Sequence, residues 1–131
     1  VTPKEALEGG LSGEMPLSPP IVVTLYQLKA HGSFDELMNG ARQRPWGEAL
    51  LPRLIPLPRG NMILEPWDPM YHAYRIQIEK PPCESDVLPP DVPFSRIWYD
   101  GRLWRPVSLE GARPPRHSNS QPAGGCAEQG D

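Results

Sequence analysis

The sequence predicts an α+β domain that is mostly β: a sheet of four or five strands or an open barrel, one short helix packed on it, and extended proline-rich termini. Several segments are rich in β-branched and aromatic residues, and an Asp-Gly pair separates two of them. The 19 prolines among 131 residues leave few windows for uninterrupted helix, which excludes a large helical bundle. We expect a single domain over residues 21–110.

The first twenty residues are expected to form an arm outside this domain. Thr2, Pro3 and Glu5 have the spacing of a helix cap, so we predict a helix of at most two turns that ends at the Gly9-Gly10 pair. Residues 11–20 contain three prolines and are predicted to be extended. Because the arm has few apolar side chains, we expect its deletion to change the stability of the domain little.

The domain begins with a predicted strand and the predicted short helix. Residues 21–28 carry no charge and are rich in β-branched side chains, which favours a strand inside the sheet. Ser33 and Glu36 match a capping box, and a helix from there would place Phe34, Leu37, Met38 and Ala41 on one face. Pro45 is expected to end this helix.

Three segments follow before the last predicted hairpin. Residues 52–58 contain three prolines, so we expect a polyproline-like chain that cannot pair regularly in a sheet. Residues 61–65 are predicted to form a short strand, and residues 71–79 a longer one with regular alternation. Residues 80–93 are expected to be a rigid, acidic, proline-rich loop.

Residues 94–107 give the strongest local signal, a β-hairpin with Asp100-Gly101 as a two-residue type I′ turn. This turn would pair Tyr99 with Arg102 and Trp98 with Leu103, and Pro106 predicts that the second strand lies at an edge. Residues 111–131 contain no Leu, Ile, Val, Met or aromatic residue, and we expect a disordered low-complexity tail.

Charge and cysteine content restrict the partners and the compartment. The net charge of −3 argues against bulk attraction to nucleic acid or to an anionic membrane, and no apolar run is long enough to span a bilayer. Cys83 and Cys126 are far apart in sequence and are expected to be unpaired thiols in a reducing compartment. No secretory signal is visible, so we expect a cytoplasmic location.

No pattern in the sequence indicates catalysis. His31, His72, His117 and the two cysteines lack metal-ligand spacing, and neither a nucleophile motif nor a phosphate-binding loop is present. We therefore expect no enzymatic activity, no metal and no cofactor.

The hairpin combines aromatic and arginine side chains, the types that dominate protein interfaces. It places aromatic residues on both faces, and one of these faces must be covered by a further layer or by another chain. We expect a structural or accessory subunit of a larger hetero- or homo-assembly, such as an enzyme-complex small subunit or a virion structural protein, that binds other protein subunits through the hairpin and its arms. The predicted binding residues are Trp67, Trp98, Tyr99, Arg102, Trp104 and Arg105.

A nucleic-acid-associated module is the alternative hypothesis. Five arginines lie between positions 96 and 116, against only Asp100 and Glu110, and aromatic residues alternate with them. Strands that stack bases use this combination of aromatic faces and guanidinium groups. The acidic balance of the whole chain ranks this hypothesis second.

Overall fold

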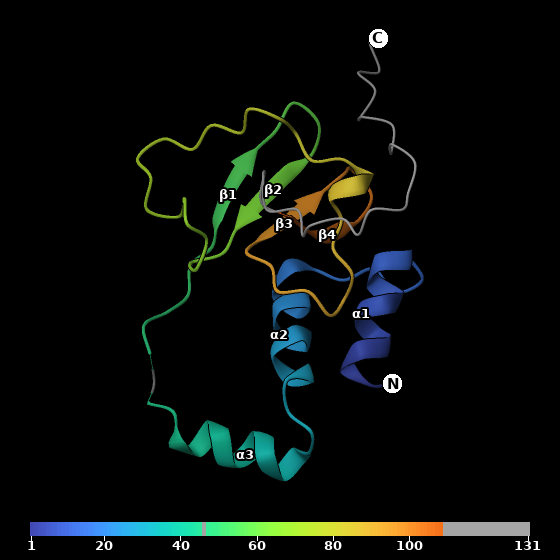
Figure 1. Ribbon diagram of the computed structural model, residues 1–131, viewed down its shortest axis with the longest axis vertical. Helices are drawn as coiled ribbons and strands as arrows, with labels where there is room; N and C mark the ends of the chain where they lie inside the picture. Colours follow the sequence, from blue (N-terminus) through green and yellow to red (C-terminus); the bar gives the residue numbers. More distant parts are fainter. Residues whose placement is uncertain (46, 109–131) are drawn as a thin grey trace, which may run out of the picture.

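The computed structural model describes residues 1–45 and 47–108, and it confirms the α+β class. The strands form one open antiparallel sheet in the order β1-β2-β3-β4 (Figure 1). The expectation of one short helix is wrong, because the described residues form three α-helices. The elements in chain order are α1 (Pro3–Ser12), α2 (Pro19–Lys29), α3 (Phe34–Gln43), β1 (Arg53–Pro56), β2 (Asn61–Leu64), the 3-10 turn η1 (Glu84–Asp86), β3 (Arg96–Tyr99) and β4 (Trp104–Val107).

Helix α1 is the short N-terminal helix that the sequence predicts, but it runs past the glycine pair to Ser12 and packs on the domain instead of forming a separate arm. The capping box forms as expected, with the Thr2 hydroxyl accepting from the Glu5 N–H and the Glu5 carboxylate accepting from the Thr2 N–H. The helix continues through the glycine pair because Gly10 leaves room for Leu17, whose Cδ1 would lie 2.6 Å from a Cβ at that position. Leu7 is 5% exposed and lies in the core. Deletion of the N-terminal segment is therefore expected to destabilise the domain, contrary to the expectation from the sequence.

Helix α2 occupies the segment 21–28, for which the prediction of a strand is wrong. Pro19 and Pro20 fit the first turn of a helix, where no N–H donor is needed. The apolar side chains then recur at helical spacing, so that Val22, Leu25 and Tyr26 all pack in the core. This tertiary packing outweighs the strand preference of the β-branched residues.

The sheet differs from the prediction at two places. Residues 53–56, which the sequence predicts not to pair in a sheet, form the edge strand β1 with Pro56 at its end, because an edge strand tolerates a residue without an N–H donor. Residues 71–79 contain no strand. Ile76 and Ile78 instead pack over one face of the sheet, so the alternation of this segment reflects a covering loop.

The hairpin of β3 and β4 is present, but its turn is not the predicted type I′ turn. The register pairs Tyr99 with Trp104 and Trp98 with Arg105, which leaves a connection of four residues, 100–103. Asp100 does not have the positive φ that type I′ requires, and its carboxylate accepts from the N–H groups of Arg102 and Leu103. The register differs from the predicted one by two residues, an even shift that leaves Ile97, Tyr99 and Trp104 on one shared face of the hairpin. The edge position of β4 is confirmed.

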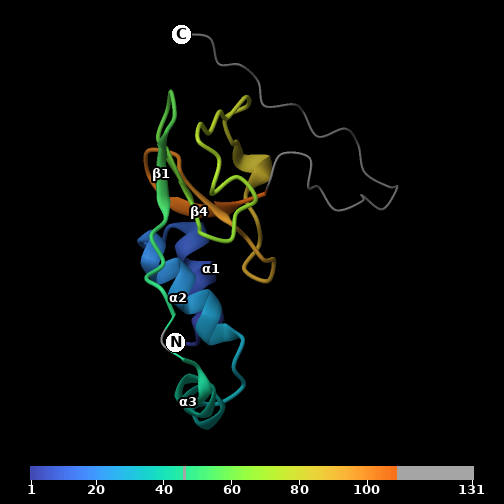
Figure 2. The same ribbon diagram turned by 90° about the vertical axis from the view of Figure 1, so that its left-hand side faces the viewer.

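Both faces of the sheet are covered by the chain itself. Helices α1 and α2 cover one face, where Leu7, Val22, Phe94 and Ile97 form a buried cluster. Of the long loop 65–92, residues 70–87 pack on the other side of the sheet, over Met62, Leu64 and Val107 (Figure 2). The second layer that the aromatic hairpin requires is therefore supplied within the chain.

The structure contradicts the expectation from the sequence for one of the two cysteines. Cys83 is disulfide-bonded, so the expectation of an unpaired thiol is wrong there; Cys126 and the tail 111–131 lie outside the described residues. Over residues 1–45 and 47–108, no helix has the length and apolarity needed to cross a membrane. The domain limits 21–110 and the cytoplasmic location stay predictions.

Candidate functional site

The predicted binding residues Trp98 and Arg105 lie together beneath the loop 65–92. Arg105 is 6% exposed, and its guanidinium carbon lies 5.7 Å from the centroid of the Trp98 ring. The same guanidinium donates to the carboxylates of Glu84 at 2.5 and 2.8 Å and of Asp100 at 2.6 Å. These hydrogen bonds lower the pKa of Glu84 and raise that of Arg105. Arg105 therefore ties the hairpin to η1.

The other predicted binding residues lie at three separate places. Tyr99 stacks on Trp104 on the helix-facing side of the sheet, with ring centroids 4.9 Å apart. Arg102 is exposed at the tip of the hairpin, and Trp67, 46% exposed, donates its indole N–H to the carbonyl of Phe94 at 2.7 Å. The six residues do not form one surface. Their role in binding other subunits stays a prediction.

A buried ion pair anchors the loop 65–92 to β3. The Arg96 Nε donates to the Asp68 carboxylate at 2.8 Å, and the side chains are 9% and 0% exposed. Burial by itself raises the pKa of Asp68, but hydrogen bonds from Arg96, Ser95 and the Met70 N–H outweigh it and hold the pKa below its usual range. Glu65, 4% exposed, behaves oppositely, because burial raises its pKa. Arg96 is thus already neutralised within the fold.

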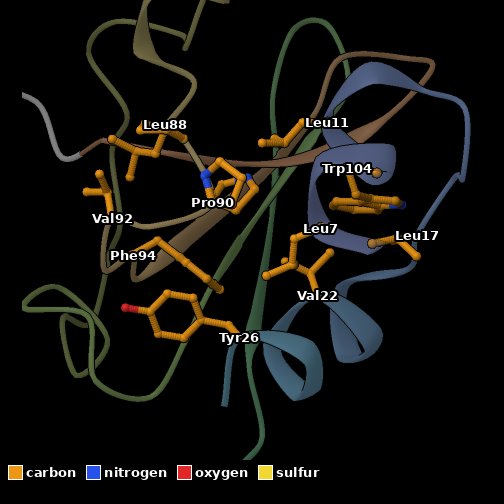
Figure 3. A pocket seen from close by; sticks show the side chains of 13 residues that line it. Leu7, Leu11, Leu17, Val22, Tyr26, Leu88, Pro90, Val92, Phe94 and Trp104 are labelled. Carbon is orange, nitrogen blue, oxygen red and sulfur yellow. The ribbon is translucent and has the colours of Figure 1, made fainter. Parts of the chain in front are cut away.

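An apolar crevice lies between the helices and the segment 88–94 (Figure 3). Its lining comes from α1, α2, this segment and β4, and includes Leu7, Tyr26, Pro90, Phe94 and Trp104. The cavity measures only about 20 Å³. That is room for about one water molecule, whereas small-molecule sites are on the order of 300–1,000 Å³. The crevice is therefore part of the packed core.

Helix α3 differs from the other two helices in that none of its residues is buried. It lies at the far end of the molecule, apart from the sheet and from α1 and α2, in both views (Figures 1 and 2). Its predicted cap is present, with the Ser33 hydroxyl accepting from the Glu36 N–H, while the Glu36 carboxylate reaches Gly32. Phe34 is 72% exposed, Leu37 and Met38 are half-buried, and Ala41 is exposed. These residues share one face of the helix, which we name the α3 apolar face.

A ten-residue helix without a packing partner is marginal in water. Helices shorter than about 12–15 residues owe their stability in proteins to the burial of an apolar face, and Gly40 in the interior of α3 lowers the intrinsic helix propensity further. The residues that the structure describes bury no side chain of this helix. The sequence reveals the apolar face, but not that the rest of the domain leaves it uncovered.

The chain beyond α3 exposes further apolar side chains. Leu50, Leu51 and Leu54 are 60%, 69% and 61% exposed, and Leu54 lies on the edge strand β1. Together with Phe34, they make up four of the nine large hydrophobic residues that are exposed in the described chain. The exposed apolar surface is therefore concentrated between α3 and β1 in sequence, away from the hairpin.

The described residues offer no arrangement for metal chemistry, since no group of three or more His, Cys, Asp or Glu side chains in residues 1–45 and 47–108 is placed to hold a metal ion. His117 and Cys126, two of the ligands that the sequence offers, lie outside this part of the chain. No protein-family model, no characterised protein and no solved structure was found to match this chain.

Proposed function

We propose that this chain is a non-catalytic structural or accessory subunit that binds another protein subunit through the α3 apolar face. The observation that carries the proposal is an amphipathic helix that has a well-formed cap but no buried residue. Such a helix gains its stability only when a second surface covers its apolar side chains. A helix that lays its apolar face against a partner is a common mode of protein recognition.

The side chains of α3 support a protein partner. Phe34 is 72% exposed and provides the aromatic anchor on which interfaces often depend. The hairpin is less available for this purpose, because Tyr99, Trp104 and Arg105 already contact partners within the domain.

The nucleic-acid hypothesis has less support. Of the arginines on which it relies, Arg96 and Arg105 are paired with carboxylates, and Arg102 alone is exposed among the described ones. Arg113 and Arg116 lie outside the described residues. Base stacking also needs free aromatic faces, and those of Tyr99 and Trp104 stack on each other.

Affinity capture tests the proposed function. The tagged full chain and its Phe34→Ser/Leu37→Ser variant would be used to recover proteins from an extract of the producing cells that also contains an untagged copy. We expect the variant to recover at least about tenfold less of a stoichiometric partner, because truncation of an anchor residue typically weakens binding by that much or more.

The matched control is Tyr74→Ser, which removes an aromatic side chain that is 93% exposed and lies outside α3. This control should recover the partner as well as the parent chain does. Equal recovery by all three proteins, or recovery of no protein by the parent chain, would contradict a binding role for the α3 apolar face.

A further inference from the structure

We propose that the partner of the α3 apolar face is the same helix of a second copy of this chain, packed antiparallel about a two-fold axis between Leu37 and Met38. This inference rests on the proposed function and names the occupant of its surface. It follows from two properties of α3, the distribution of large and small side chains along its apolar face and the distribution of its charges.

The shape of the helix is complementary to itself. Phe34 projects from the first turn and is 72% exposed. The other end of α3 carries the small residues Gly40 and Ala41, which take up little space beside the helix. A two-fold axis between positions 37 and 38 places the large Phe34 of each copy opposite the small Ala41 of the other. The same axis places Leu37 opposite Met38.

The charges of the helix follow the same symmetry. The first turn carries Asp35 and Glu36, and the last turn carries Arg42. Asp35 and Arg42 form no ion pair with the described residues. Antiparallel pairing brings the acidic turn of each copy beside the basic turn of the other and also opposes the helix dipoles. A parallel pair would instead place like charges together.

The composition of the C-terminal segment does not suit it as the occupant. Residues 111–131 contain no Leu, Ile, Val, Met or aromatic side chain with which to cover an apolar face. A second copy supplies both a matching apolar face and opposite charges. A two-fold interface of this kind is isologous, because each copy contributes the same residues.

The expected dimer is weak. A helix of ten residues is about 15 Å long, and a contact of that length belongs with small, transient interfaces. Sedimentation equilibrium of the full chain, from about 1 µM to about 1 mM, should therefore show a monomer that converts to a dimer as the concentration rises. Phe34→Ala should shift the midpoint of this conversion at least about tenfold upward. Tyr74→Ala should leave it unchanged.

Charge variants test the antiparallel orientation. Asp35→Arg and Arg42→Asp should each weaken self-association, because each places like charges together at both ends of the helix pair. An equimolar mixture of the two variants, or the double variant, should restore dimerisation. The mixture requires only that each variant folds, which circular dichroism verifies.

The outcomes separate this inference from the proposed function. A chain that is monomeric throughout the concentration range, or a dimer that neither charge variant weakens, overturns the second copy as the occupant. If α3-dependent capture of a different protein persists in that case, the proposed function stands. Restoration by the mixed charge variants supports the antiparallel pair directly.

Discussion

Replacing Gly60 by alanine should destabilise the protein by roughly 3 kcal/mol or more. Gly60 has φ +77°, and a Cβ at this position would lie 1.8 Å from the backbone carbonyl oxygen of Tyr99. Neither atom can move unless the turn between β1 and β2 separates from the end of β3. The free energy of unfolding, measured with a chemical denaturant, gives the size of the effect.

Gly101→Ala is the matched control for this prediction. Gly101 also has a positive φ, +98°, but no heavy atom lies within 4 Å of the place where its Cβ would be. The cost there should be only the backbone strain of a left-handed residue, about 1–2 kcal/mol. If the two variants unfold with the same free energy, the close approach of Gly60 to β3 is not part of the folded state.

Asp68→Asn should lower the free energy of unfolding by about 3–5 kcal/mol at neutral pH, because it leaves the buried guanidinium of Arg96 without its counter-charge. The two side chains are 0% and 9% exposed. The control is Asp91→Asn, which removes the exposed ion pair with Lys29 and should have a much smaller effect. A loss no larger than that of the control would contradict the anchoring role of the Arg96–Asp68 pair.

The difference between Asp68→Asn and the parent chain should depend on pH. The pKa of Asp68 is lower in the folded state than in the unfolded chain, so its stabilisation is present above about pH 4 and is lost as the pH falls through the folded pKa. The two unfolding free energies should therefore converge in acid. Glu65 contributes with the opposite sign, because its raised pKa penalises the folded state as the pH rises.

The sequence predicts correctly those helices and strands that are determined by residues close together in the chain. The cap at Thr2, the cap and apolar face of α3, the strand at 61–64 and the paired strands around Asp100-Gly101 all depend on residues within a few positions of one another. The turn type was missed because the Asp100 carboxylate bonds to two backbone N–H groups and stabilises a longer connection.

The errors concern elements that depend on distant contacts. Residues 21–28 have strand-like composition, but packing against α1 and the sheet makes them helical. Residues 71–79 alternate as a strand would, but they form no strand, and Ile76 and Ile78 instead cover one face of the sheet. The same limit applies to the site. The sequence predicted the apolar face of α3, but the absence of a packing partner among the described residues is a property of the whole fold.

Hydrogen exchange of the backbone amides in α3 tests the central claim most directly, because this helix should be protected only when its apolar face is covered. We predict that protection over residues 38–43 rises with the concentration of the full chain, while amides in α2 and β2 keep constant protection. Phe34→Ala should abolish the rise. Protection of α3 that is the same at every concentration, or fast exchange throughout, would contradict a second copy on the α3 apolar face.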